Sequence, residues 1–249
     1  MGGRSESDAS GQMRLDRFLC ELGTGTRSQA KDMVKSGRVR VNGETARKAD
    51  VKISPGRDEV TLDGQALVWE ETVWYMLNKP AGVLSASTDP KRETVVSLVP
   101  GGRKDIFPVG RLDADTTGLL LITNDGELAH RLLSPKRHCA KVYHVVTDLP
   151  IPEDAGSLFA RGIDLGDFVT MPADWEPERE NTGFLTLHEG KFHQVKRMFA
   201  SMGLTVTALK RVSFAGIPLD TGLGPGECRP LDAGEIAQLK KAGGLTEQE

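Results

Sequence analysis

An Arg and an Asp stand two residues apart in the stretch Gly110-Arg111-Leu112-Asp113, just before the apolar run Leu119 to Leu121. The apolar run predicts a buried strand, so core packing should fix the end of the loop that carries both charges. An ionised carboxylate held in this way can act as a nucleophile or as a base, whereas an exposed Arg and Asp form only a solvated ion pair. These four residues alone do not decide between the two interpretations.

The residues that follow, Asp115-Thr116-Thr117-Gly118, are similar to the Asp-Thr-Gly sequence of aspartic proteases. The additional Thr breaks the match, and the chain has one such copy where a protease needs two carboxylates. We therefore exclude a protease. The side chains of Asp115, Thr116 and Thr117 are instead expected to brace the loop through local hydrogen bonds.

Composition favours a soluble globular protein, because 38% of the 249 residues are hydrophobic and 27% are charged. No apolar run approaches the roughly 20 residues that span a membrane, so we expect no membrane partner. Residues 1–12, rich in Gly, Ser and acidic groups, predict a disordered tail. The three cysteines are widely spaced and include no Cys-x-x-Cys, which indicates neither a disulfide framework nor a zinc site and favours the cytoplasm. The sequence also lacks nucleotide-phosphate loops and metal-ligand clusters, so we expect no cofactor and no metal.

The N-terminal part predicts a small α/β unit with a basic surface. Between residues 13 and 60 there are 11 Lys and Arg against 7 Asp and Glu, whereas the remainder of the chain is acidic. Apolar residues recur with helical spacing from Leu15 to Leu22, and Ser28 could cap a second helix that stops at Gly37. Alternation from Arg38 to Val41 before Asn42-Gly43 predicts a strand that enters a hairpin.

This helix-turn-helix-strand pattern, with SQAKDMVKSGRVRVNG at its centre, resembles the S4 RNA-binding module. In that family, outward basic residues follow RNA phosphates and structured RNA backbone. The resemblance therefore implies RNA contacts for five residues: Arg27, Lys31, Lys35, Arg38 and Arg40. A merely solvated basic helix face is the competing interpretation.

The longer C-terminal part predicts several strands and short helices. Strands are expected from Trp74 to Leu77 and from Lys141 to Thr147, with Pro80 ending the first. Asn124-Asp125-Gly126 predicts a turn into a short helix that directs Leu128, Ala129, Leu132 and Leu133 to one side. A helix with core residues Val195, Met198, Phe199 and Met202, and a last helix from Leu231 to Lys241, complete the pattern.

Four segments in this order resemble the pseudouridine synthases of the ribosomal small-subunit type: YMLNKPAGVL, GRLDADTTGLLLITNDGELAHRL, KVYHV and EGKFHQVKRMF. The resemblance implies an α+β fold, in which an S4-like head precedes a mixed, mostly antiparallel sheet with helices to one side and a cleft across its middle. The expected domains are the tail at 1–12, the head at 13–62, a linker at 63–72 and a catalytic domain at 73–249.

The resemblance also implies roles for particular residues. Asp113 matches the catalytic carboxylate, either as a nucleophile on C1′ or base C6 or as the base of an elimination. Lys196 matches the cation that keeps this carboxylate ionised, with Arg197 as the fallback, and a buried carboxylate would otherwise tend to protonate. Tyr143 matches the tyrosine that stacks on the flipped base, with transfer of the C5 proton as a second candidate role. Arg111 matches the residue that fills the gap left in the RNA, and Arg197 is grouped with it as a base-flipping candidate.

The resulting function hypothesis is an isomerase that converts a uridine of ribosomal RNA to pseudouridine, with uridine 516 of 16S rRNA as the candidate target. Its partner would be ribosomal RNA or a small-subunit assembly intermediate, and the protein would act as a monomer. Two alternatives stay open: a synthase for a 23S rRNA uridine, and a non-enzymatic rRNA-binding assembly factor. A pure binding protein has no use for Asp113, Tyr143 and Lys196 together, which favours the enzyme.

Overall fold

The chain divides into two units, and the computed structural model describes residues 11–245 of it. The N-terminal unit comprises residues up to Val73 together with Val99–Ile106, and the larger unit comprises the remainder. Most of the expected tail, residues 1–10, lies outside the described residues. Within the described part, no helix is long and apolar enough to cross a membrane.

In the N-terminal unit two helices pack against a small sheet. The core is formed by apolar residues of both helices, among them Leu15, Phe18, Leu19 and Val34, with Val39 from the sheet. Strands β2, β3, β5 and β6 form a sheet of order β3-β2-β5-β6, and β1 pairs with β4. The elements are β1 (Met13–Arg14), α1 (Leu15–Glu21), α2 (Arg27–Lys35), β2 (Val39–Val41), β3 (Glu44–Thr45), β4 (Lys52–Ile53), β5 (Val60–Leu62) and β6 (Gln65–Leu67).

Two details of this unit differ from the sequence-based expectations. The cap of α2 is Thr26 rather than Ser28, because Thr26 accepts a hydrogen bond from the Gln29 amide while the Gln29 side chain accepts one from the Thr26 amide. Residues 63–72 are not simply a linker, because β6 lies within them and pairs with β5 through the register Leu62 to Gln65. The predicted helices and hairpin are otherwise present.

The segment Val99–Ile106 belongs to the N-terminal unit although it follows the first strand of the larger one. Gly102 packs so closely against Gly23 that a Cβ on Gly23 would lie 2.3 Å from the Gly102 carbonyl oxygen. The buried Arg103 pairs with Asp105, and its guanidinium lies 4.9 Å from the centre of the Trp69 ring. Sequence periodicity gives no indication of this return of the chain.

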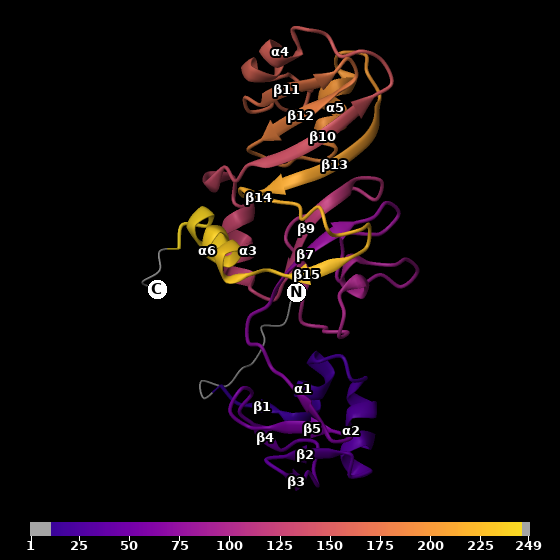
Figure 1. Cartoon of the computed structure of the whole chain (residues 1–249), viewed down its shortest axis with the longest axis vertical. Coiled ribbons are helices and arrows are strands. Elements are labelled where there is room, and N and C mark those ends of the chain that lie inside the picture. Colours follow the sequence, from indigo (N-terminus) through magenta and orange to yellow (C-terminus); the bar gives the residue numbers. More distant parts are fainter. Residues whose placement is uncertain (1–10, 246–249) are drawn as a thin grey trace. The chain divides into compact units, whose positions relative to one another are not determined.

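The larger unit is built on a nine-stranded sheet whose main order is β11-β12-β10-β13-β9-β7-β15, as Figure 1 shows. Among the described strands β9 and β13 pair in parallel and the other pairs are antiparallel, so the expected mixed, mostly antiparallel sheet is confirmed. The strands are β7 (Trp74–Lys79), β8 (Phe107–Pro108), β9 (Thr117–Thr123), β10 (Lys141–Thr147), β11 (Asp174–Arg179), β12 (Thr182–Leu187), β13 (Val206–Phe214), β14 (Ile217–Pro218) and β15 (Cys228–Pro230). The helices are η1 (Val95–Leu98), α3 (Gly126–Leu133), η2 (Pro135–Arg137), α4 (Ala155–Arg161), α5 (Gln194–Ala200) and α6 (Ala233–Ala242).

The α-helices of the larger unit cover one face of this sheet. Lys141 and Tyr143 point to the same face of β10, because side chains alternate along a strand. Lys141 lies beside Phe214, which packs with α3 and α6, and Tyr143 lies beside Leu185 and Trp175 in the register of β12 and β11. The Trp175 ring contacts aromatic residues of α4 and α5. One expected core residue is misplaced, because Leu133 at the end of α3 is 43% exposed.

Gly118 allows the close parallel pairing of β9 and β13. Its φ is +96°, and a Cβ at this position would lie 2.3 Å from the Arg211 carbonyl oxygen. We expect Gly118→Ala to lower the free energy of unfolding by about 3 kcal/mol, because the backbone must leave either this conformation or this contact. Urea unfolding followed by circular dichroism measures the change.

Gly126→Ala is the matched control for this substitution. Gly126 opens α3, and a Cβ added there would have its nearest neighbour, on the Phe107 ring, 4.0 Å away. The control should leave stability unchanged or raise it by up to about 1 kcal/mol, since Ala favours the helix. Equal stabilities of the two variants would show that the β9–β13 contact tolerates a side chain.

Candidate active site

The loop that carries Asp113 is tied to the segment that follows β7. Gly110 opens it with a φ of +77°. The Leu112 amide donates to the Ser85 hydroxyl at 3.0 Å, and that hydroxyl donates to the Leu112 carbonyl at 2.7 Å. The Gly82 amide donates to the Ala114 carbonyl at 2.7 Å. These bonds tie the loop to the segment that follows β7.

A buried lysine completes the support of this loop. Lys79, at the end of β7, has no exposed surface, and its ammonium donates to three backbone carbonyls: Pro80 at 3.0 Å, Ala114 at 3.2 Å and Thr116 at 2.9 Å. Burial lowers the pKa of Lys79, while Asp115 and Asp113 act in the opposite direction. Lys79 therefore fixes both ends of the turn that follows Asp113.

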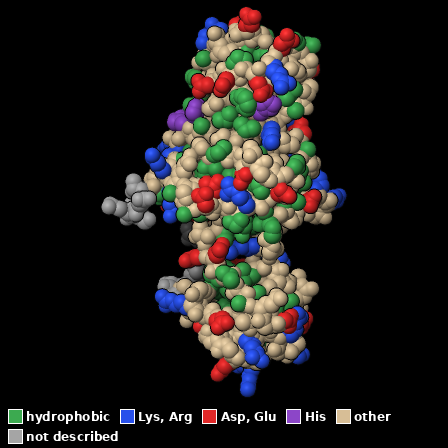
Figure 2. All heavy atoms as spheres, in the orientation of Figure 1, with side chains coloured by type: hydrophobic (Ala, Val, Ile, Leu, Met, Phe, Trp, Pro, Cys, Tyr) green, Lys and Arg blue, Asp and Glu red, His purple; other side chains and the backbone are tan. Residues whose placement is uncertain are grey.

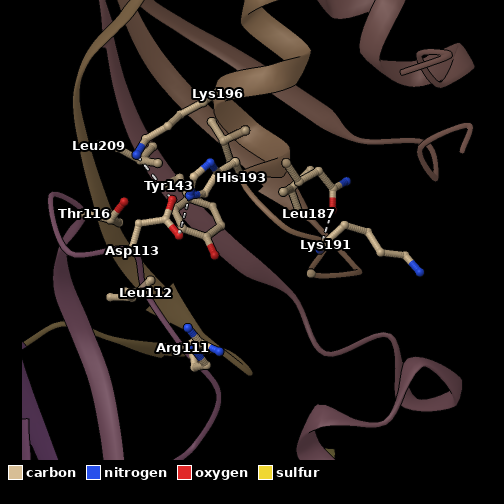
Figure 3. Close-up of a pocket in the computed structure, with 13 residues that line it drawn as sticks. Arg111, Leu112, Asp113, Thr116, Tyr143, Leu187, Lys191, His193, Lys196 and Leu209 are labelled. Carbon is tan, nitrogen blue, oxygen red and sulfur yellow. Dashed lines mark hydrogen bonds and ion pairs between the residues drawn. The ribbon is translucent and has the colours of Figure 1, made fainter. Parts of the chain in front are cut away.

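Asp113, Tyr143 and Lys196 line one pocket, together with Arg111 and His193 (Figure 3). They come from separate elements: the loop before β9, the strand β10, and the start of α5. The pocket is a shallow, open hollow on the surface of the larger unit. The three residues that the sequence predicts as catalytic are therefore brought together at the middle of the sheet.

Two carboxylates share the Lys196 ammonium. Its Nζ lies 3.2 Å from Asp113 Oδ2 and 2.6 Å from Asp115 Oδ1. Burial acts to lower the pKa of Lys196, but the hydrogen bonds to Asp115 and Asp113 outweigh it and raise the pKa above its usual value. The bond from Lys196 also lowers the pKa of Asp115. At neutral pH the cluster therefore holds a charged ammonium against two carboxylates.

His193 is a residue of the site to which the sequence alone assigns no role. Its Nε2 lies 3.5 Å from Asp113 Oδ1, and its backbone has a φ of 50° at the start of α5. The buried Gln194 fixes this turn, because its side chain accepts from the Lys191 amide at 3.0 Å and donates to Glu189 at 2.8 Å. The segment HQVKRMF is a recognisable motif, but periodicity places His193 only on a solvated helix face.

The two arginines expected to act on RNA lie in different surroundings. Arg111 is exposed and lines the pocket, below Asp113 in Figure 3. Arg197 does not line it: its guanidinium pairs with Asp167, donates to the Leu165 carbonyl at 3.0 Å and lies 5.2 Å from the centre of the Phe168 ring. Lys196 alone of the two neighbouring cations faces Asp113.

The expected bracing by Asp115, Thr116 and Thr117 is wrong. Asp115 binds Lys196 from α5, and the Thr116 hydroxyl is buried without a hydrogen-bond partner. The Thr117 hydroxyl reaches the Leu209 carbonyl at 3.4 Å, on β13. The local bond is made by the backbone, where the Thr116 amide donates to the Asp113 carbonyl at 3.1 Å. Lys79 and Ser85 provide the bracing that was expected of these side chains.

The five basic residues expected to bind RNA are exposed in the N-terminal unit. Arg27, Lys31 and Lys35 are spaced four residues apart and lie along one side of α2. Arg38 forms a two-point ion pair with Asp63, so part of its charge is already compensated. On the face shown in Figure 2, Lys and Arg of this unit alternate with Asp and Glu.

A compact S4-type head and a sheet-centred Asp–Lys–Tyr pocket define an RNA-modifying enzyme, and comparison with known proteins gives the same class. The family model described as RNA pseudouridylate synthase matches residues 73–201, and the S4 domain model matches residues 13–58. The chain belongs to the RNA pseudouridylate synthase family, whose members isomerise uridine in RNA.

The similar proteins extend over nearly the whole chain. The ribosomal small subunit pseudouridine synthase A of Escherichia coli strain K12 is 41% identical over 232 residues, which cover 91% of this chain and 100% of that one. An uncharacterised RNA pseudouridine synthase of Bacillus subtilis is 42% identical over 236 residues, 92% of this chain and 99% of that one. A crystal structure of a pseudouridylate synthase is 39% identical with a TM-score of 0.65, and covers 91% of this chain and 99% of that one.

Removing the three charges along α2 should weaken RNA binding through its electrostatic part. We expect the combined substitution Arg27→Gln, Lys31→Gln and Lys35→Gln to reduce the slope of log affinity against log salt by about 0.7 to 0.9 for each phosphate that the protein no longer neutralises. Filter binding of ribosomal RNA at several salt concentrations gives the slope.

The control for this prediction removes charge elsewhere. Lys240→Gln and Lys241→Gln, in the exposed last turn of α6, lower the positive charge without touching α2. A slope that changes equally per charge in both variants would mean that α2 has no special part in binding.

Proposed function

We propose that this protein converts a uridine of small-subunit ribosomal RNA to pseudouridine, with Asp113 as the catalytic carboxylate. The observation that supports this most directly is the convergence of Asp113, Lys196 and Tyr143 on one pocket, in a chain that also carries an S4 head. The reaction breaks the N1–C1′ bond, turns the uracil within the site, and forms the C5–C1′ bond.

Asp113 is suited to this chemistry by its surroundings. Its Oδ2 lies 3.2 Å from the Lys196 ammonium and its Oδ1 lies 3.5 Å from His193 Nε2, so both oxygens are held in place at the pocket. The ionised carboxylate acts either as a nucleophile, on C1′ or on C6 of the base, or as the base that begins an elimination. Both routes use the same geometry.

Tyr143 and Arg111 are assigned to the extruded nucleotide. A target base must leave its stack, at a cost of a few kcal/mol, before it can enter the pocket. Tyr143 on β10 is only 9% exposed, and its aromatic ring lies beside Asp113 in the pocket (Figure 3). Arg111 is exposed and lies in the loop that carries Asp113. There its guanidinium can occupy the space that the extruded base leaves in the RNA.

The ribosomal target is inferred from the relatives. Similar proteins of Escherichia coli and of Pseudomonas aeruginosa, 41% and 42% identical, are named ribosomal small subunit pseudouridine synthase A. On this basis we propose 16S rRNA as the substrate, as free RNA or within an assembling subunit. Uridine 516 as the candidate site is carried over from the family resemblance of the sequence motifs, and we propose a monomer that acts in the cytoplasm. A 23S rRNA uridine is the alternative target, and pseudouridine mapping of rRNA from cells with and without the gene distinguishes them.

Asp113→Asn should abolish turnover while RNA binding survives. The substitution keeps the size of the side chain and most of its hydrogen bonds but removes the negative charge. Tritium release from [5-³H]uridine-labelled rRNA measures turnover, and filter binding measures affinity. Asp115→Asn is the matched control, because Asp115 contacts the same ammonium from the same loop but is 72% exposed.

The control should retain most of the wild-type activity, since Asp113 keeps its own contact with Lys196. Loss of turnover in Asp115→Asn with normal release by Asp113→Asn would transfer the catalytic role to Asp115. Normal release by both variants would exclude a carboxylate mechanism at this loop.

Tyr143→Phe and Tyr143→Ala should separate stacking from proton transfer. If the ring stacks on uracil, Phe keeps substrate affinity and Ala loses about 1–3 kcal/mol of it. If the hydroxyl also moves the C5 proton, Tyr143→Phe binds normally but releases little tritium. Binding and release by Tyr143→Ala at the wild-type level would mean that Tyr143 is only a structural residue of β10.

A further inference from the structure

An exposed aromatic ring stacks on a residue that lines the pocket, and the reaction described above does not use it. Phe192 is 75% exposed, although it belongs to the short turn that delivers His193 and Lys196 to the site. Its ring stacks on the His193 ring, with centroids 3.8 Å apart and planes inclined by 19°. One face of Phe192 is therefore covered by His193, while most of its surface faces solvent.

The turn that carries this ring is held by side-chain hydrogen bonds. His193, on which the ring stacks, approaches Asp113 at 3.5 Å, and the turn is fastened by the buried Gln194 through its bonds to Lys191 and Glu189. A solvent-facing Phe gains little from burial in the free protein. Holding it on an ordered turn next to an RNA-binding pocket instead provides a surface on which a second flat group can stack.

The charges around Phe192 suit a nucleic acid strand. Lys191 precedes it and is exposed, and Figure 3 shows its side chain extending away from the pocket. On the pocket side, Lys196 is paired with Asp113 and Asp115, so the exposed Lys191 is the neighbouring cation that can meet a phosphate. Stacking of bases on aromatic rings beside cations that meet the phosphates is the usual way in which proteins hold unpaired nucleotides.

We propose that the Phe192–His193 pair is a stacking platform for an unpaired base adjacent to the target uridine. The platform holds the strand while the target nucleotide occupies the pocket, so Phe192 is a positioning residue that acts on substrate binding. The inference rests on the proposed function only in requiring an RNA substrate that the wild-type enzyme modifies, whichever ribosomal subunit supplies it.

The first test compares Phe192→Ala, Phe192→Trp and the wild-type protein on [5-³H]uridine-labelled total rRNA from cells that lack the gene. Loss of one stacked base should raise KM roughly 5- to 150-fold in Phe192→Ala with kcat unchanged, and Trp should restore the wild-type KM. Leu149→Ala is the matched control, because Leu149 is an apolar side chain of the same unit that is 56% exposed and does not line the pocket. It should behave as the wild type.

The second test is a double-mutant cycle that combines a change in the protein with a change in the RNA. The wild-type enzyme first identifies the modified uridine, and transcripts are then made with an abasic nucleotide on its 5′ or its 3′ side. One of these changes should weaken binding of the wild type but have no further effect on Phe192→Ala, because both changes remove the same interaction.

Each other outcome overturns the platform. Equal effects of the abasic changes on both proteins, or a wild-type KM in Phe192→Ala, would show that no base stacks on Phe192. A lower kcat at unchanged KM would assign Phe192 to holding His193 beside Asp113. Modification of a 23S uridine by the wild type would contradict the proposed target, yet the comparison of variants on that uridine would still decide the platform.

Discussion

The site depends on one buried ammonium group. Lys79 has no exposed surface, and its three bonds to the carbonyls of Pro80, Ala114 and Thr116 join the end of β7 to the turn after Asp113. Removing a charged group from water is costly unless its hydrogen bonds are satisfied, and here three backbone acceptors satisfy it. Two of these acceptors belong to the turn after Asp113. Burial of the lysine therefore depends on the conformation of the turn, and the conformation of the turn depends on the lysine.

A second lysine, Lys196, also has several partners, and it contacts the side chains that the loop presents. Lys196 reaches two carboxylates, of which Asp113 is 30% exposed and Asp115 is 72% exposed. Both carboxylates raise the pKa of Lys196, and the inner one, Asp113, lines the pocket. Because Lys196 divides its contacts between two carboxylates, it supports Asp113 and still leaves that carboxylate accessible to a substrate.

Much of the fold follows from local sequence signals. Apolar spacing and turn residues predict α1, α2, the β2–β3 hairpin, β10 and α6, because each is decided by which face it buries and where Gly or Asn ends it. The family resemblance assigns Asp113, Tyr143 and Lys196 to one site. No pattern in the sequence gives the distances between them. Lys79, Ser85 and His193 escape such patterns because their roles arise from contacts with distant parts of the chain. The expected bracing of the loop by its own Thr side chains fails for the same reason: Thr116 is enclosed by the fold and has no local acceptor.

The return of Val99–Ile106 to the N-terminal unit means that the chain passes between the two units three times. An RNA-binding module joined by one linker can be lost, duplicated or exchanged by recombination at a single point. Here, loss of residues up to Val73 would leave Arg103 without Trp69 and Gly102 without Gly23. Exchange of the whole head as a module would consequently have to replace two separate segments of the gene together.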